Sequence, residues 1–128
     1  MIKTGAQLVQ DAKQTITEKT IEELQQEMNE HTVLIDVREP QEFSQGRIDG
    51  AVNFPRGVLE MQLANHPVCA SSENPLETLN QQEIYLICRS GARSALAAES
   101  LNRMGFEKVT SVAGGMMAWE QKGLPLVK

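Results

Sequence analysis

The chain alternates short apolar runs with stretches of helical periodicity, and this alternation constrains its fold more than any other feature. Apolar, often β-branched runs at residues 32–37, 51–54, 84–87 and 109–112 predict short strands. The segments between them carry apolar residues three or four positions apart, which is typical of amphipathic helices. Strands that alternate with helices favour an α/β domain with a mostly parallel sheet. Ligands of such sheets bind at the carboxyl ends of the strands.

An additional helix and a small strand are expected ahead of this main alternation. Thr4 and Gln7 form a capping-box pair, which predicts that a helix begins within residues 1–13. Residues 14–17 predict a fifth, small strand. We therefore expect an N-terminal helical extension over residues 1–13 and a single domain over residues 14–128.

The remaining helices are predicted from capping residues and apolar spacing. Thr20 and Glu23 form a second capping box. Apolar stripes predict further helices over residues 94–104 and 116–122. The polar segment at residues 67–82 contains two prolines, and we interpret it as an excursion over the surface.

Composition excludes several classes of protein. The 12 Lys and Arg against 17 Asp and Glu give a net charge of -5, which argues against a nucleic-acid partner. The 2 cysteines are too few for a secreted disulfide scaffold. No apolar run approaches the roughly 18 residues that span a bilayer, and the first residues lack a secretory signal. We expect a cytoplasmic protein without a membrane partner. His31 and His66 have no cysteine or carboxylate at ligand spacing, so we expect neither a metal nor a cofactor.

The apolar run at residues 84–87 leads directly into Cys88, a short loop and a helix. A strand end, a glycine turn and a helix N-terminus aim backbone N–H groups into one concavity. Such amides, together with nearby guanidinium groups, favour a thiolate over a thiol. The alternative is a buried structural thiol, but such a thiol gains nothing from a cationic loop. We therefore predict an anion-accepting cradle with Cys88 as nucleophile, formed by Arg89, Ser90, Gly91, Ala92, Arg93 and Ser94.

Five stretches in a fixed order carry a resemblance to a known family. They are LIDVRE at 34–39, GRIDGAVNFP at 46–55, CRSGARS at 88–94, GGMMAW at 114–119 and GLP at 123–125. With them the chain resembles a single-domain rhodanese, a domain of the thiosulfate sulfurtransferase type. The resemblance implies a three-layer α/β fold with a mostly parallel five-stranded sheet flanked by helices. The short N-terminal helix lies outside the family core.

The resemblance also implies a reaction in two steps. The Cys88 thiolate takes the outer sulfur of thiosulfate, or of a persulfide or polysulfide, and becomes a persulfide. Cyanide, a small thiol or a protein thiol then accepts that sulfur. We expect Arg93 to contact the anionic donor. Arg89 either does the same or pairs with Asp36 or Glu42.

Several roles stay open at this stage. Asp36 and Arg38, like Glu42, are candidates for a supporting position behind the loop. Cys69 is interpreted as an incidental thiol, with the alternative that it resolves a persulfide or forms a regulatory disulfide. The glycine pair at residues 114–115 is expected to let the backbone pass close to the loop.

Two other functions are weighed against sulfur transfer. One is a sulfur-carrier or regulatory binding module with little thiosulfate turnover. The other is a cysteine phosphatase or arsenate reductase, whose cradle resembles a cysteine and an arginine separated by one more residue. Only four residues separate Cys88 from Arg93. The residue before the cysteine is Ile87, where cysteine phosphatases commonly have histidine. Both features argue against the phosphatase.

Overall fold

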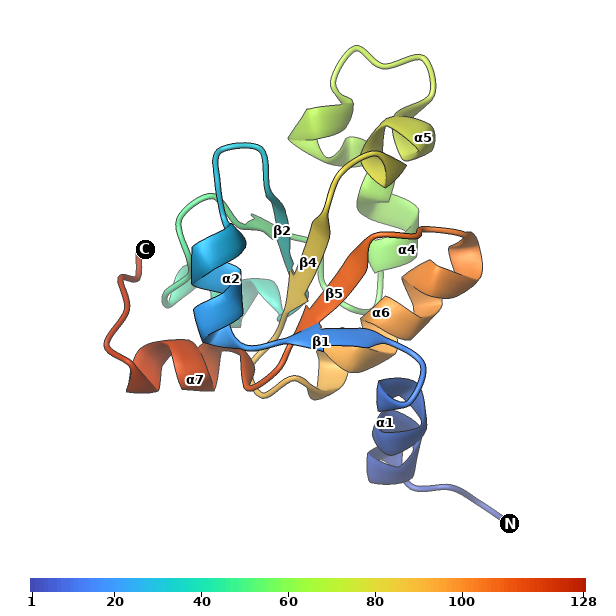
Figure 1. Cartoon of the computed structure of the whole chain (residues 1–128), viewed down its shortest axis with the longest axis vertical. Coiled ribbons are helices and arrows are strands. Elements are labelled where there is room, and N and C mark those ends of the chain that lie inside the picture. Colours follow the sequence, from blue (N-terminus) through green and yellow to red (C-terminus); the bar gives the residue numbers. More distant parts are fainter.

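A computed structural model describes residues 1–128 and shows a five-stranded sheet between two layers of helices (Figure 1). The strand order is β1-β5-β4-β2-β3, and every neighbouring pair is parallel. The predicted α/β fold with a parallel five-stranded sheet is confirmed. The strands are β1 (Thr17–Lys19), β2 (Val33–Asp36), β3 (Val52–Asn53), β4 (Ile84–Ile87) and β5 (Val109–Val112).

Short helices and single 3-10 turns connect the strands. Thr4 and Thr20 each accept a backbone N–H in a complete capping box, so both predicted boxes are confirmed. The helices are α1 (Gly5–Lys13), α2 (Ile21–Glu27), α3 (Pro40–Ser44), α4 (Leu59–Gln62), α5 (Pro75–Asn80), α6 (Ala92–Met104) and α7 (Gly115–Gln121), and the 3-10 turns are η1 (Leu63–Asn65) and η2 (Pro67–Cys69).

Alternating strand residues supply two hydrophobic cores, one on each face of the sheet. Ile84 and Leu86 of β4 pack in the larger core with residues of α4, α5 and α6. Tyr85 and Ile87 point to the other face and pack with residues of α2 and α7. Figure 1 shows α2 and α7 on one side of the sheet and α6 on the other. The cores therefore hold β4 rigidly just before the loop that follows it.

Two predicted boundaries are shifted. The first strand is Thr17–Lys19 and not residues 14–17, because its register is set by pairing with β5, with Thr17 opposite Thr110. Helix α6 begins at Ala92 rather than at Ser94, because Gly91 adopts a left-handed conformation and serves as its N-cap. The first turn of α6 is therefore part of the loop expected to surround Cys88.

The interpretation of residues 67–82 as a surface excursion is wrong in part. The segment forms η2 and α5, and it places Cys69 and Leu79 in the larger core, exposed by 4% and 0%. Its two prolines stand at the first positions of these helices, where a missing N–H costs nothing. The prolines start short helices here and do not interrupt the fold.

The N-terminal helix packs on the main domain. Ala12 of α1 is fully buried, and α1 contacts α6. The boundary expected after residue 13 therefore marks the end of a helix that packs on the domain. It does not divide the structure into two independent bodies. No helix of the structure combines the length and apolar character that crossing a membrane requires.

Candidate active site

Cys88 lies at the carboxyl end of β4, and backbone N–H groups point at its sulfur. The N–H of Gly91 donates to Sγ at 3.1 Å, and the N–H of Ser94 approaches Sγ at 3.4 Å. The thiol is 1% exposed. Two backbone N–H groups of the predicted loop thus lie within hydrogen-bonding range of this sulfur. Such donors stabilise a negative charge on the sulfur and do little for a neutral thiol.

The cradle forms because the chain turns sharply from strand to helix. Gly91 has φ of 103°, a conformation that is costly for any residue with a Cβ. The turn directs the N-terminus of the 13-residue α6 at Cys88. The first N–H groups of a helix lack partners inside the helix and carry its positive dipole end. The sulfur therefore occupies the place of a bound anion.

The glycine pair before α7 lies against the back of this loop. The N–H groups of Met116 and Met117 donate to the carbonyl oxygens of Cys88 and Arg89, at 2.8 and 2.9 Å. A Cβ on Gly115 would stand 2.3 Å from the Cys88 oxygen. The predicted close passage of Gly114 and Gly115 is confirmed. These two hydrogen bonds hold the Cys88 and Arg89 carbonyls against the start of α7.

Arg93 is held by a carboxylate on α3. Its two terminal nitrogens donate to the two Glu42 oxygens at 2.7 and 3.0 Å, which is a bidentate pair. The hydrogen bond from Arg93 is the main cause that lowers the pKa of Glu42 to about 2. The same bond is the main cause that raises the pKa of Arg93, with a smaller contribution from the charge of Cys88. Arg93 thus lies within electrostatic range of the sulfur, partly neutralised by Glu42.

A second ion pair stabilises the end of β2. Asp36 is fully buried and accepts hydrogen bonds from the backbone N–H and the guanidinium of Arg38, at 2.8 to 3.1 Å. Arg38 also donates to the Gly46 carbonyl at 2.8 Å. A buried charge needs such a partner, so each residue of the pair satisfies the other. The pair shapes the edge of the sheet next to the loop.

Two roles were left open for Arg89, and the structure does not show the pairing with Asp36 or Glu42. Those carboxylates pair with Arg38 and Arg93. Arg89 is exposed and forms no ion pair. Its side chain borders a polar pocket of about 200 Å³ beside the loop. The pocket is lined by Arg38, Glu42, Gln45, Gly46, Arg89, Glu120 and Leu126.

The loop also contacts a residue that the sequence analysis did not single out. The Ser94 Oγ lies 3.5 Å from the Cys88 sulfur and 2.8 Å from the Oγ of Ser111 on β5. Both serines are fully buried. The signal in the sequence was a small polar residue inside an apolar strand, which is informative only once its partner is known.

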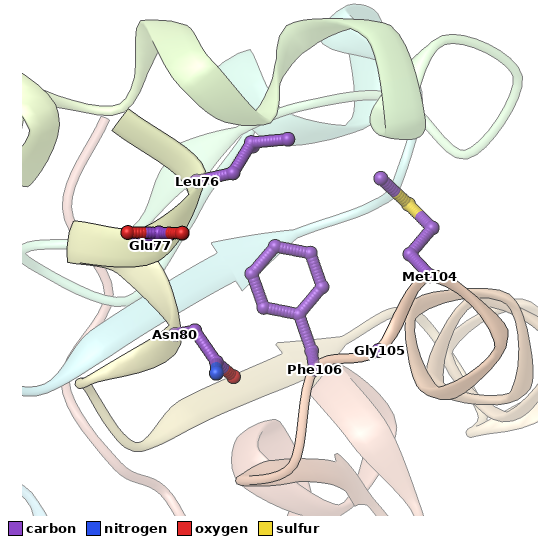
Figure 2. Close-up of a pocket in the computed structure, with 6 residues that line it drawn as sticks. All are labelled: Leu76, Glu77, Asn80, Met104, Gly105 and Phe106. Carbon is purple, nitrogen blue, oxygen red and sulfur yellow. The ribbon is translucent and has the colours of Figure 1, made fainter. Parts of the chain in front are cut away.

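A different pocket, of about 170 Å³, lies away from this site between α5 and the end of α6 (Figure 2). Leu76 and Met104 project toward the space around the Phe106 ring. Helix α6 separates this pocket from Cys88, and its 13 residues span about 20 Å. None of the loop residues lines the pocket. The structure has no cluster of three or more His, Cys, Asp or Glu side chains arranged to bind a metal.

This fold and this cysteine loop define a class of protein, and comparison with known families identifies it. The model of the rhodanese-like domain matches residues 20–122, so the chain belongs to the rhodanese-like domain family. The match begins just after β1 and includes the whole loop around Cys88.

Three similar proteins represent the range of relatives. A sulfurtransferase of Allochromatium vinosum is 32% identical over 98 residues, which are 77% of this chain and 80% of the relative. The "Putative sulfur carrier protein YrkF" of Bacillus subtilis is 32% identical over 123 residues, which are 94% of this chain but only 60% of the relative. A solved structure from Rhodopseudomonas palustris, described as a protein of unknown function and "Possible Tyrosine Phosphatase", has a TM-score of 0.81 and 27% identity. That similarity covers 99% of this chain and 96% of the other.

Proposed function

We propose that the protein is a sulfurtransferase that carries sulfur as a persulfide on Cys88. The observation that carries the proposal is the cradle, in which the N–H groups of Gly91 and Ser94 point at a buried sulfur beside the N-terminus of α6. Membership of the rhodanese-like family and a relative named as a sulfurtransferase support it. The protein is thus proposed to be an enzyme of the thiosulfate sulfurtransferase type.

The proposed first step loads the cysteine. The Cys88 thiolate attacks the outer sulfur of thiosulfate and forms a new S–S bond. The S–S bond of thiosulfate breaks, and its electron pair leaves with sulfite. The persulfide that remains carries one negative charge, which the loop amides stabilise. A persulfide or polysulfide donor reacts in the same way and releases a thiolate or a shorter polysulfide.

The second step unloads the cysteine and restores the thiolate. Cyanide attacks the outer sulfur of the persulfide and leaves as thiocyanate, while the electron pair of the S–S bond returns to Cys88. A small thiolate or a protein thiolate takes the sulfur in the same manner. No general base is needed, because both leaving groups are stable anions. The two free cysteines and this thiol chemistry suit a reducing compartment, and we propose the cytoplasm.

Arg89 is proposed as the main contact for an anionic donor. It is exposed beside the loop and forms no ion pair. Arg93, which was expected to have this role, shares its charge with Glu42. It is proposed to assist the sulfur at closer range and to hold α3 against the loop. Asp36 and Arg38 are proposed to act only by fixing the end of β2.

A sulfur carrier is the second candidate, favoured by the similarity to the carrier-named relative over 94% of this chain. A carrier would load Cys88 and deliver the sulfur to one protein partner, with little turnover on cyanide. The hypothesis of a cysteine phosphatase is supported by the description of one structural neighbour. The four residues between Cys88 and Arg93 argue against it, because they leave a cradle smaller than the phosphatase loop.

Steady-state assays with thiosulfate and cyanide separate these functions. We expect sulfite and thiocyanate in equal amounts, with all activity lost in Cys88→Ser and retained in Cys69→Ala. Sulfite in a single burst without thiocyanate would support the carrier. Hydrolysis of an aryl phosphate without sulfite release would contradict sulfur transfer in both forms.

A further inference from the structure

A chain of two buried hydroxyl groups ends at the sulfur of Cys88. The Ser111 and Ser94 oxygens lie 2.8 Å apart, and the Ser94 oxygen lies 3.5 Å from the sulfur. Both serines are fully buried. The Ser111 hydroxyl has no other hydrogen-bond partner in the structure. The three side chains come from the residue after β4, from α6 and from β5, so these hydrogen bonds link three elements behind the loop.

The position of Ser111 follows from the alternation of β5. In the pairing of β5 with β4, Ser111 lies opposite Leu86. Leu86 is two residues before Cys88. Ser111 points to the same face of the sheet as Val109. The neighbouring Thr110 points to the other face of the sheet. A hydroxyl buried in an apolar strand is destabilising unless it is hydrogen-bonded. Ser94 is the one group that satisfies Ser111.

The directions of the hydrogen bonds among Ser111, Ser94 and Cys88 depend on the charge of the sulfur. A thiolate has no proton to donate, so the Ser94 hydroxyl donates to the sulfur and the Ser111 hydroxyl donates to Ser94. Every hydroxyl proton then has an acceptor. If Cys88 is a thiol that donates to Ser94, the Ser94 hydroxyl turns to Ser111, and the Ser111 proton has no acceptor. If Cys88 does not donate, its thiol proton is unpaired instead. Every proton on the side-chain oxygen or sulfur atoms of Ser111, Ser94 and Cys88 therefore has an acceptor only when the sulfur is an anion.

We propose that Ser111 is a positioning residue that acts through Ser94 to favour the reactive thiolate of Cys88. By donating to Ser94, it orients the Ser94 hydroxyl toward the sulfur. The inference rests on the proposed function in one respect, since the thiolate is the species that attacks the sulfur donor. Ser111 itself does not touch the donor or the reacting sulfur.

The test is the pH dependence of alkylation of Cys88 by iodoacetamide, a neutral reagent that needs no sulfur donor. Trypsin leaves Cys69 and Cys88 in one peptide, because no lysine or arginine lies between Arg56 and Arg89. Modification is therefore assigned to Cys88 by fragmenting that peptide. The variants are Ser111→Ala, Ser94→Ala and the double variant, with Thr110→Val as the control on the same strand. Thermal unfolding establishes that each variant is folded.

In Ser111→Ala, we expect the midpoint of the alkylation profile to rise by roughly half to one pH unit, the effect of one buried hydrogen bond. The rate at high pH changes little, because Cys88 is fully ionised there with or without the Ser111 hydroxyl. Thr110→Val keeps the wild-type midpoint. Ser111→Thr, which retains the hydroxyl group that Ser111→Ala removes, also has the wild-type midpoint. In the Ser94→Ala background, Ser111→Ala causes no further shift, since its only route to the sulfur is gone.

Two results would overturn the proposal. One is an unchanged midpoint in Ser111→Ala, and the other is a shift of equal size with and without the Ser94 hydroxyl. Either result leaves the persulfide mechanism standing, because that mechanism is measured by sulfite and thiocyanate. Conversely, a protein that forms no thiocyanate still yields an alkylation profile, so the two failures are distinguishable.

Discussion

Gly115 offers a sharp test of how the loop around Cys88 is supported. It is buried at the start of α7, and its φ is 53°. An added Cβ would lie 2.3 Å from the Cys88 carbonyl oxygen and 2.7 Å from that of Arg89. Contacts this short force the backbone of the loop or of α7 to move. Gly115→Ala therefore disturbs the cradle without altering any group that touches the sulfur.

The size of the effect follows from two contributions. A left-handed conformation costs an alanine about 1–2 kcal/mol. Overpacking against backbone atoms costs about 1–3 kcal/mol more. We expect Gly115→Ala to lower the free energy of unfolding by about 2–5 kcal/mol, a large share of the stability of a domain this size.

Gly105→Ala is the matched control, because Gly105 also has a positive φ, 108°, and an added Cβ would meet nothing within 4 Å. It pays only the conformational cost of about 1–2 kcal/mol. Urea unfolding of both variants measures the difference, and sulfur loading from thiosulfate measures the state of the cradle. We expect Gly115→Ala to be the less stable variant and the one that loads poorly. Equal losses of stability would refute the claim that α7 fixes the loop.

Three further predictions concern charges and the second cysteine. The pKa of Glu42 is lowered from 4.5 to about 2, so its ion pair with Arg93 stabilises the fold above pH 4.5 and is lost as the pH falls through about 2. The stability difference between wild type and Glu42→Gln, measured by urea unfolding, should shrink over that range; a constant difference would contradict this. Arg89→Ala should slow loading from thiosulfate roughly tenfold, and less so in high salt, while alkylation by neutral iodoacetamide changes little. An equal effect on both reagents would rule out donor attraction. Cys69→Ala should retain sulfur transfer and lose about 1–2 kcal/mol of stability by urea unfolding, since Cys69 is buried in the larger core; loss of transfer in a folded variant would assign Cys69 a role in the reaction.

The parts of the fold that depend on local signals could be predicted from the sequence. The strand at residues 84–87, both capping boxes and the turn at Gly91 are specified within a few residues, and all are present. The cradle of N–H groups follows from the same local geometry, because a strand, a glycine and a helix in this order leave few alternatives.

The partners of the charged residues could not be predicted, because they depend on distances across the fold. Arg93 and Glu42 are 51 positions apart, and their pairing depends on where the fold places α3 relative to the first turn of α6. The link from Ser94 to Ser111 depends on the register of β5 against β4. Cys69 appeared to lie in a polar surface segment, but its short helices fold back and bury it. In each case the missing information was tertiary.

The central claim is that Cys88 carries sulfur, and mass spectrometry after incubation with thiosulfate tests it most directly. We predict that the intact protein gains the mass of one sulfur atom, that fragmentation places this sulfur on Cys88, and that cyanide removes it as thiocyanate. Cys69→Ala should gain the same mass, and Cys88→Ser should gain none. A folded wild-type protein that acquires no sulfur from thiosulfate, persulfide or polysulfide would contradict the account.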